Sequence, residues 1–431
     1  MPRSSHPGLS LRLNVSWTLA GNVVYAGCQW LTLVALARLG TPEMVGQFAL
    51  AMALTAPIFM LTNLNLRAVQ ATDARLDFSF AEYFGLRLLT TSAALAGVGA
   101  VSLWGGYRRE TALIVAAIGV AKAFEAISDI LYGVFQHHER MDRIAVSMMI
   151  KGPLSLAAMA VALSVTGSVF VASIAMTLVW AAVLAAYDVP RAARILRSDP
   201  GDRLRPAWDR PRLTTLARIA FPLGCVTMLI SLNSNVPRYF IERTLGEGPL
   251  GIFAAIASLM IAGGVVVNAL GQSASPRLSR YAADGDATAY RALMTRLYGM
   301  SLALGGAGIL VAVAAGPLIL TTLFGSEYAR HSGVLIWLMG AAALSFIFSM
   351  LGTSLTALRC FRIQAVLHTM SAGVSIPLFF YLTRAQGLVG AARALFIQAL
   401  MMMLVYGWAE ARARTGAAVG QTVRPGEVPA A

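Results

Sequence analysis

The chain has 431 residues, of which 57% are hydrophobic and only 13% are charged. Because soluble domains carry about 25% charged residues, this composition argues against a cytosolic enzyme, a nucleic-acid-binding protein and a disordered chain, and favours a protein surrounded mostly by lipid. The formal net charge of +14 does not indicate a nucleic-acid partner, because the arginines lie between apolar segments and no aromatic RNA-binding motif accompanies them.

Twelve apolar segments are long enough to cross the hydrocarbon core, which takes about 20 helical residues. In chain order they span residues 14–39, 46–70, 81–106, 111–136, 144–166, 168–189, 214–242, 251–275, 290–315, 333–358, 363–383 and 387–411. The first is too long for a signal-peptide core, so we interpret it as an uncleaved spanning helix. The joint Thr166-Gly167-Ser168 is so short that the fifth and sixth segments are expected to form a tight helical hairpin. The sequence therefore predicts an all-α integral membrane protein with twelve transmembrane helices.

The basic residues between these segments predict the orientation in the membrane. With the N-terminus in the cytoplasm, 25 of the 34 lysines and arginines fall on the cytoplasmic side, Arg87 and Lys151 among them. We therefore expect both termini to be cytoplasmic. This topology divides the chain into a cytoplasmic N-terminus (residues 1–13), a six-helix lobe (14–189), a basic cytoplasmic linker (190–213), a second six-helix lobe (214–411) and a disordered cytoplasmic tail (412–431).

An internal repeat supports the division into two lobes. The segment that begins at Leu39-Gly40 resembles the one that begins at Leu245-Gly246, and after one gap the offset is 205 residues. The same offset aligns Asn63 with Asn268. An offset of six helices preserves orientation, so the two lobes are expected to be parallel, with a substrate path through a central cavity between them.

One predicted span contains three charged residues on a single helix face. Lys122, Glu125 and Asp129 are spaced i, i+3 and i+7, and charges inside a membrane are expensive unless they meet a partner or water. Two carboxylates on this face predict a site that couples transport to a gradient of H⁺ or Na⁺. The alternatives are a static ion pair between Lys122 and Glu125, and an Asp129 that reaches the cytoplasmic headgroups.

The remaining polar residues in the spans predict a substrate-binding surface. The span at 214–242 holds the densest group, in which Arg238 follows a proline and is suited to bidentate binding of an anionic head group. The alternative is that Arg238 pairs with Glu242 at the membrane interface. The candidate substrate-binding residues are Arg38, Asn63, Arg67, Asn233, Asn235, Arg238, Asn268 and Arg393. Anchoring explains Arg38 and Arg67 equally well, and Asn63 and Asn268 are equally suited to hydrogen bonds between helices.

The sequence contains no catalytic, metal-binding or nucleotide-binding motif that withstands inspection. The pair His137-His138 lies in a short loop without a third ligand, the three cysteines have no ligand spacing, and no phosphate-binding glycine loop is present. We therefore expect neither an enzyme, nor a metal site, nor a cofactor beyond a coupling ion.

The sequence resembles the polysaccharide-transport family of oligosaccharide-lipid flippases, within the superfamily that includes the MATE multidrug exporters. The resemblance lies in Phe221–Phe253, with Pro222-Leu-Gly, Asn233, Pro237-Arg238-Tyr239, Leu245-Gly246 and Leu250-Gly251-Ile-Phe253, and in Leu39–Arg67, which ends Asn63-Leu-Asn65-Leu-Arg67. Twelve spans and a basic central linker agree over essentially the whole chain. The peptidoglycan-precursor flippases of the superfamily usually have fourteen spans, which disfavours their substrate.

The resemblance implies a MATE-like fold and a flippase of the bacterial inner membrane. Its expected substrate is an undecaprenyl-diphosphate-linked glycan for O-antigen (lipopolysaccharide), capsule or exopolysaccharide assembly, with a polysaccharide polymerase and a chain-length regulator as expected partners. The cationic cavity of such proteins would be supplied here by Arg38, Arg238 and Arg393. The alternative is a MATE-like exporter of drugs or metabolites driven by a cation gradient. The third reading, a membrane polymerase or ligase, lacks the large external loop that carries the catalytic residues of such enzymes.

Overall fold

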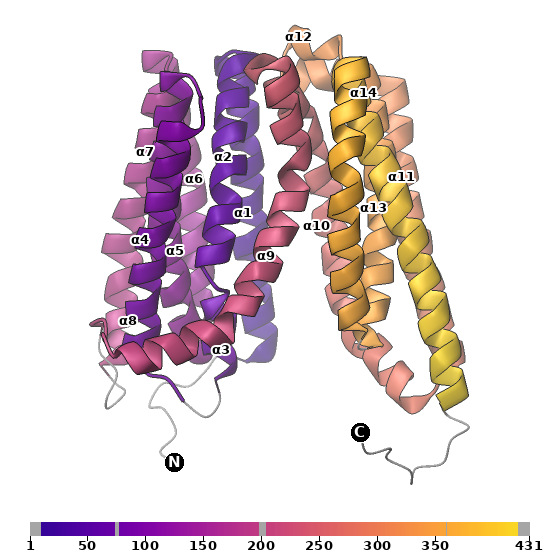
Figure 1. Ribbon diagram of the computed structural model, residues 1–431, viewed down its shortest axis with the longest axis horizontal. Coiled ribbons are helices and arrows are strands. Elements are labelled where there is room, and N and C mark those ends of the chain that lie inside the picture. The colour runs from indigo at the N-terminus through magenta and orange to yellow at the C-terminus, as the bar shows by residue number, and fades with distance from the viewer. Residues whose placement is uncertain (1–9, 74–76, 198–203, 359, 421–431) are drawn as a thin grey trace. The chain divides into compact units, whose positions relative to one another are not determined.

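The computed structural model describes residues 10–73, 77–197, 204–358 and 360–420, and every regular element in these residues is helical. The helices are labelled as in Figure 1. They are α1 (Leu11–Leu39), α2 (Pro42–Thr62), α3 (Leu66–Thr72), α4 (Phe80–Trp104), α5 (Arg109–His137), α6 (Met141–Thr166), α7 (Val169–Val183), the π-helical turn η1 (Leu184–Asp188), α8 (Val189–Leu196), α9 (Arg210–Leu245), α10 (Glu247–Asp284), α11 (Ala287–Leu323), α12 (Ser326–Ala329), α13 (Ser332–Ala357) and α14 (Phe361–Gly420).

The predicted membrane spans appear in the predicted order. Among the described residues, eleven helical segments are long and apolar enough to cross a membrane. The last of them belongs to α14, in which Gly387 has non-helical dihedrals (φ 61°, ψ −140°), so α14 folds back on itself there (Figure 1). Glycine adopts this positive φ at no steric cost. The kink separates the eleventh and twelfth predicted spans, and the all-helical membrane fold is confirmed.

Local sequence signals explain where several helices begin and end. Ser10 and Thr41 cap α1 and α2 by accepting hydrogen bonds from backbone amides of the first turn, and Pro42 occupies the first helical position of α2. The short joint between α6 and α7 is the expected tight hairpin, because Gly167 takes a left-handed conformation (φ 63°) and Ser168 caps α7.

The second predicted span, 46–70, is not one helix. The helix α2 ends at Thr62, and α3 begins at Leu66 after Leu64 and Asn65, both of which have positive φ angles near 50°. Asparagine tolerates this region better than most residues, but leucine does not, and residues 58–72 contain neither glycine nor proline to signal a break. The surrounding packing imposes the break: Leu64 and Leu66 are buried in the core beside Leu131 and Phe135 of α5.

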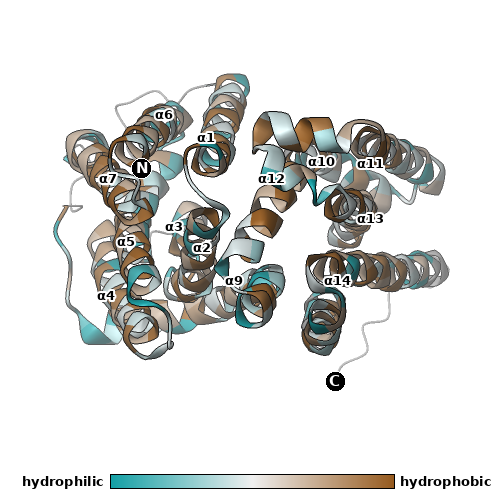
Figure 2. Cartoon of the chain, turned by 90° about the horizontal axis from the view of Figure 1, so that it is seen from above, coloured by the Kyte–Doolittle hydropathy of each residue, from teal (hydrophilic) through white to brown (hydrophobic). Residues whose placement is uncertain are grey.

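The described chain forms two compact units, residues 1–251 and 252–431. In the first unit α5 packs against α2, α3, α4 and α7, while α1 packs against α6 and α9 against α2. These helices run side by side and are seen nearly end-on in Figure 2. In the second unit α13 packs against both α11 and α14. The predicted linker, 190–213, includes most of α8 and the first turn of α9. Its placement as the boundary of the two lobes stays a prediction.

Both ends of the chain extend partly outside the described residues. The predicted N-terminal segment, 1–13, is described only from residue 10, and α1 begins at Leu11. At the other end α14 continues to Gly420, so the chain is still helical over the first nine residues of the predicted disordered tail, 412–431. Residues 421–431 lie outside the described part.

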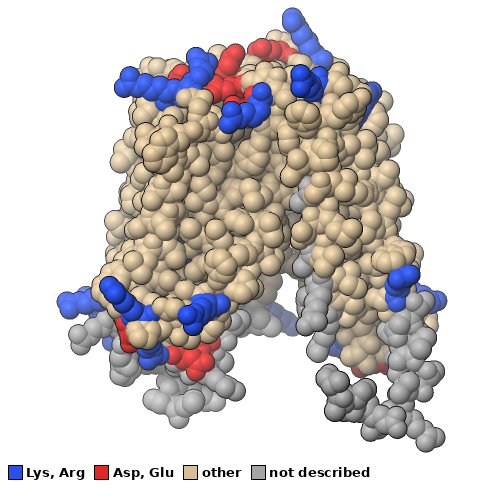
Figure 3. All heavy atoms as spheres, viewed as in Figure 1, with Lys and Arg blue, Asp and Glu red and all other residues tan. Residues whose placement is uncertain are grey.

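The helix surfaces match a lipid environment. Large apolar residues such as Trp104 (82% exposed), Val165 (78%) and Leu310 (71%) are exposed on the outer surfaces of the helices. On the face shown in Figure 3, charged atoms gather near the ends of the helices, and a band without described charges lies between them in each unit. A soluble protein rarely exposes so much continuous apolar surface, whereas a lipid-facing surface requires it.

The start of the internal repeat forms a reciprocal contact between α2 and the first turn of α10. A Cβ atom on Gly46 would strike the carbonyl oxygen of Glu247, and one on Gly251 would strike that of Pro42. These residues correspond at the repeat offset of 205, since Pro42 aligns with Glu247 and Gly46 with Gly251. The Glu247 carboxylate accepts hydrogen bonds from Gln47 Nε2 (3.1 Å) and from the Thr111 hydroxyl. Glycine is needed here because two helix backbones touch.

Candidate functional site

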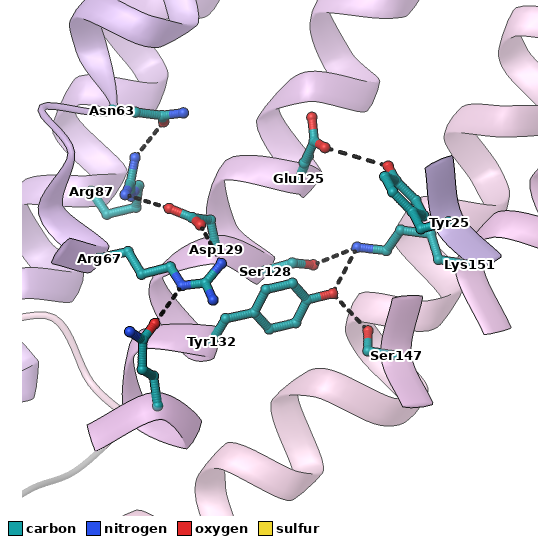
Figure 4. A network of polar contacts seen from close by, with 11 residues as sticks. Tyr25, Asn63, Arg67, Arg87, Glu125, Ser128, Asp129, Tyr132, Ser147 and Lys151 are labelled. Carbon is teal, nitrogen blue, oxygen red and sulfur yellow. Dashed lines mark hydrogen bonds and ion pairs between the residues drawn. The ribbon is translucent and has the colours of Figure 1, made fainter. Parts of the chain in front are cut away.

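A cavity of about 180 Å³ lies within the first unit, among α1, α3, α5 and α6. Its lining includes Arg67, Glu125, Asp129, Tyr132 and Lys151. Figure 4 shows these side chains converging from several helices into one network of polar contacts. Three of the sequence-predicted residues, Arg67, Glu125 and Asp129, therefore meet at one place.

Two arginines hold the Asp129 carboxylate. Arg67 Nη1 lies 3.5 Å from Oδ1 and Arg87 Nη2 lies 3.2 Å from Oδ2. Arg87 also donates a hydrogen bond to the Asn63 side chain, and Arg67 Nε donates to Gln136 (3.0 Å). Both guanidinium groups point toward Asp129 in Figure 4. Asp129 thus forms ion pairs inside the first unit, which differs from the alternative in which it reaches the headgroups.

The break between α2 and α3 builds this part of the network. It ends α2 at Thr62, makes Asn63 its C-cap, and restarts the chain as α3, which carries Arg67 to the cavity. Asn63 thereby makes a hydrogen bond between helices, which is one of the two roles that the sequence left open. Arg67 lies in the cavity lining beside the predicted ion-coupling carboxylates.

Glu125 lies near the middle of α5 and pairs with Lys122. The Lys122 ammonium is 2.7 Å from Glu125 Oε2, and Tyr25 of α1 donates a hydrogen bond to Oε1 (3.4 Å). The ion pair named as the alternative to a coupling site is therefore present. Both Glu125 (35% exposed side chain) and Asp129 (31%) keep part of their surface open, so each is accessible to water and small ions. Their role in coupling stays a prediction.

A third group in this network was missed by the sequence analysis. Lys151 of α6 is buried and donates hydrogen bonds to Ser128 (3.2 Å) and Tyr132 (3.4 Å), and its ammonium is 4.0 Å from the buried Asp188. Ser128 in turn donates to Asp188 (2.8 Å). This arrangement satisfies a buried cation with one carboxylate and two hydroxyl oxygens, as burial requires.

Depth along the helix could have identified Lys151 and Arg87. Both were assigned to the cytoplasmic side, but Lys151 is the eleventh residue of α6, about 15 Å from its start, which is half of a hydrocarbon core of about 30 Å. Arg87 is the eighth residue of α4 and is completely buried. The assignment of these two basic residues to the cytoplasmic side is thus wrong, because both face partners inside the bundle.

The predicted residues of α9 form a separate group. Arg238 Nη1 donates to Asn235 Oδ1 (2.8 Å), and the Asn235 amide donates to the carbonyl of Ser231 (2.8 Å). Asn235 is buried and Asn233 is half-buried on the same helix. Arg238 binds Asn235, whereas Glu242, the predicted alternative partner, forms an ion pair with Arg243 (3.8 Å).

The other predicted residues lie in separate places. Arg38 is exposed in the last turn of α1. Asn268 and Arg393 belong to the second unit, where Asn268 is exposed on α10. The Arg393 guanidinium lies 5.0 Å from the centre of the Trp337 ring and donates to Gln386 (2.7 Å). A substrate-binding role for these residues stays a prediction.

The helices and their apolar surfaces define a multi-pass membrane protein, and the fold is that of known transporters. The chain belongs to the polysaccharide biosynthesis protein family, whose sequence model matches residues 11–282. It is 28% identical over 397 residues to the capsular polysaccharide biosynthesis protein CapF of Staphylococcus aureus, covering 91% of this chain and 97% of CapF.

Solved structures share the fold over nearly the whole chain. The lipid II flippase MurJ, in an inward closed conformation, superposes with a TM-score of 0.73 at 12% identity, covering 94% of this chain and 91% of MurJ. An outward-facing multidrug resistance transporter of the MATE family, in the MOP superfamily, gives a TM-score of 0.62 at 14% identity and covers 96% of each chain. These similarities concern the fold, and the predicted MATE-like fold is confirmed.

Proposed function

We propose that the chain is a flippase that moves an undecaprenyl-diphosphate-linked oligosaccharide across the bacterial inner membrane by alternating access. Family membership and the similarity to CapF support a role in polysaccharide assembly, and the fold shared with MurJ supports lipid-linked transport. A protein is needed for this step, because the desolvation of a charged diphosphate prevents its unaided passage through hydrocarbon. A polysaccharide polymerase and a chain-length regulator are the proposed partners.

The cavity of the first unit carries the proposal that transport is coupled to an ion gradient. Its volume of about 180 Å³ is below the range of about 300–1,000 Å³ typical of small-molecule sites, so it suits an ion and a few waters better than a glycan. Two partly open carboxylates, Glu125 and Asp129, line it opposite fixed cations. Binding of H⁺ or Na⁺ to either carboxylate would weaken its ion pairs and so bias the packing of α1, α3 and α5.

The test of the flippase proposal uses a strain that lacks the gene. Polyprenyl-linked glycans are isolated, and a membrane-impermeant lectin or glycosidase applied to spheroplasts reports their leaflet. We expect completed repeat units to accumulate on the cytoplasmic face, and the wild-type gene to reverse this. A double variant, Arg238→Ala with Arg393→Ala, should insert normally and accumulate the same intermediate.

The competing function is a MATE-like exporter driven by a cation gradient, which the match to the MATE transporter over 96% of the chain favours. Normal surface glycan without a trapped intermediate in the deletion strain would support the exporter, provided that no redundant flippase is present. Normal glycan export by the double arginine variant would contradict the prediction that Arg238 and Arg393 contribute to a cationic substrate-binding cavity.

Glu125→Gln tests the coupling site. The amide cannot exchange a proton and holds Lys122 less strongly, so glycan export should depend less on the proton or sodium gradient, as measured by adding ionophores to spheroplasts. Glu110→Gln is the matched control, because Glu110 is exposed in the first turn of the same helix. An unchanged ionophore response in Glu125→Gln would assign Glu125 to packing alone.

A further inference from the structure

The second unit contains a larger cavity whose lining differs from that of the first unit. It has a volume of about 490 Å³ and lies among α10, α13 and α14, with Gln272, Ser345, Phe348, His368 and Tyr406 in its wall. This volume lies within the usual range for small-molecule sites. Among the described residues, its lining contains no aspartate, glutamate, lysine or arginine.

Several polar groups in this wall have no partner in the described part of the chain. The Tyr406 hydroxyl is one, although its side chain is only 1% exposed. Gln272, Ser345 and the ring nitrogens of His368 likewise make no hydrogen bond to any described residue. Buried polar groups are normally paired, so an unpaired hydroxyl on a residue of the cavity wall favours a site that binds a polar ligand.

An aromatic cluster forms one side of the same cavity. Phe348 and Tyr406 meet edge to face with ring centres 4.6 Å apart, and the His368 ring lies 6.0 Å from Phe348 and 5.9 Å from Tyr406. Such a wall presents apolar ring surface beside hydroxyl and amide groups. A sugar ring has the matching chemistry, because its C–H groups pack on aromatic surface while its hydroxyl groups both donate and accept hydrogen bonds.

Charge decides which part of a lipid-linked glycan fits. A diphosphate requires cationic donors, and the described lining supplies none. The charged pair that follows Tyr406 on α14 is already engaged: Arg414 binds Glu410 (2.5 Å), which also accepts hydrogen bonds from Tyr298 (3.3 Å) and Ser354. An uncharged, hydroxyl-rich group is therefore the best match.

We propose that this cavity binds an uncharged sugar residue of the transported glycan, an inference that rests on the proposed flippase function. The orphaned hydroxyl of Tyr406 and the amide of Gln272 would bond sugar hydroxyls, and the aromatic cluster would pack against the ring. The diphosphate binds elsewhere, so the two parts of the substrate are recognised by different chemistry.

Binding measurements on the full chain in lipid nanodiscs test this site. The probes are undecaprenyl diphosphate without sugar and the lipid-linked oligosaccharide extracted from the deletion strain. Tyr406→Phe removes only the hydroxyl, and Gln272→Ala removes the amide. Each should weaken binding of the sugar-bearing probe by about 3- to 10-fold, the effect of one hydrogen bond, and leave binding of undecaprenyl diphosphate unchanged.

The matched control is Tyr381→Phe, which removes a hydroxyl from a side chain on the same helix that is 71% exposed. It should change neither affinity. Since the Tyr406 hydroxyl has no described partner, Tyr406→Phe should not lower the melting temperature, so a loss of affinity would not reflect misfolding.

Three outcomes would overturn the inference. Equal affinity of the wild-type protein for both probes would remove the sugar site and leave the flippase proposal intact. An equal loss for both probes in Tyr406→Phe would assign Tyr406 a structural role only. Binding of neither probe by the wild-type protein would overturn the flippase proposal itself, and this inference with it.

Discussion

At the scale of single residues, the first unit is organised around buried cations that each face several oxygen atoms. Arg87 is fully buried against Asp129 and Asn63, and Lys151 is buried against Asp188, Ser128 and Tyr132. A lone charge at this depth would cost several kcal/mol, so each cation and its partners depend on one another. Removing one member of such a group leaves a buried charge without its partner. The loss of stability is therefore larger than the net stabilisation that the ion pair contributes.

A double-mutant cycle on Lys151 and Asp188 measures this dependence. Lys151→Met leaves a buried carboxylate without its cation, and Asp188→Leu leaves a buried ammonium without its carboxylate. Each single change should cost about 3–5 kcal/mol of stability. The double variant should lose less than the sum of the two, with a coupling energy of about 0.5–3 kcal/mol, as measured by denaturant unfolding in micelles. Additive losses would show that the pair is not coupled.

At the scale of the elements, one half of the internal repeat is interrupted and the other is not. The chain breaks between α2 and α3, whereas the corresponding part of α10, around Asn268, is continuous helix. In the first unit the break lets Arg67 pair with the partly exposed Asp129, and it lets Asn63 accept a hydrogen bond from Arg87, which also binds Asp129. This difference gives two segments of similar sequence different chemistry, with charged groups in the first and an uncharged cavity in the second.

The reciprocal contact between Gly46 and Gly251 is tested by two glycine substitutions, one inside the contact and one outside it, which should change stability in opposite directions. Gly46→Ala places a methyl group against the backbone of Glu247, so it should destabilise the protein by about 1–3 kcal/mol. The control is Gly99→Ala on α4, where a Cβ meets nothing within 4 Å. Because alanine is the better helix former, the control should stabilise by about 0.5–1 kcal/mol. Thermal unfolding compares them, and equal shifts would disprove the close contact.

At the scale of the whole molecule, the arginine pattern makes a testable statement about orientation. It places the loop before α5 on the periplasmic side and the loop after α5 in the cytoplasm. With the three native cysteines replaced by serine, Arg109→Cys should react with an impermeant thiol reagent added to whole cells, and His137→Cys should react only after permeabilisation. Both native side chains are exposed at opposite ends of the same helix. The reverse pattern of labelling would invert the proposed topology.

Much of the fold could be predicted because the signals are long and redundant. A spanning helix has about 20 apolar residues, so twelve such segments appear in the sequence without any knowledge of packing. Short signals were equally reliable where one residue decides the backbone, as at Gly167 between α6 and α7. The break at Leu64 and Asn65 was not predictable, because residues 58–72 contain no glycine or proline and are expected to continue as a helix.

The candidate site was predicted only where its residues share one helix. The i, i+3, i+7 spacing of Lys122, Glu125 and Asp129 revealed that face of α5 directly. The partners Arg87, Lys151 and Asp188 come from other helices, and their pairing depends on distances that no periodicity encodes. The cavity around Tyr406 could not be predicted for the same reason. Neutral serine, glutamine and aromatic residues in apolar helices are common in helix packing and do not by themselves indicate a binding site.

The sequence by itself determined that this protein is helical, that it crosses a membrane many times and which family it belongs to. These properties follow from composition, segment length and local motifs. In lipid every backbone polar group must be hydrogen-bonded within the protein, so a long apolar segment forms a spanning helix whatever its neighbours are. The tertiary structure alone decided which polar groups meet. A buried charge is stable only beside its partners, and those partners come from helices that are distant in sequence and adjacent only after packing.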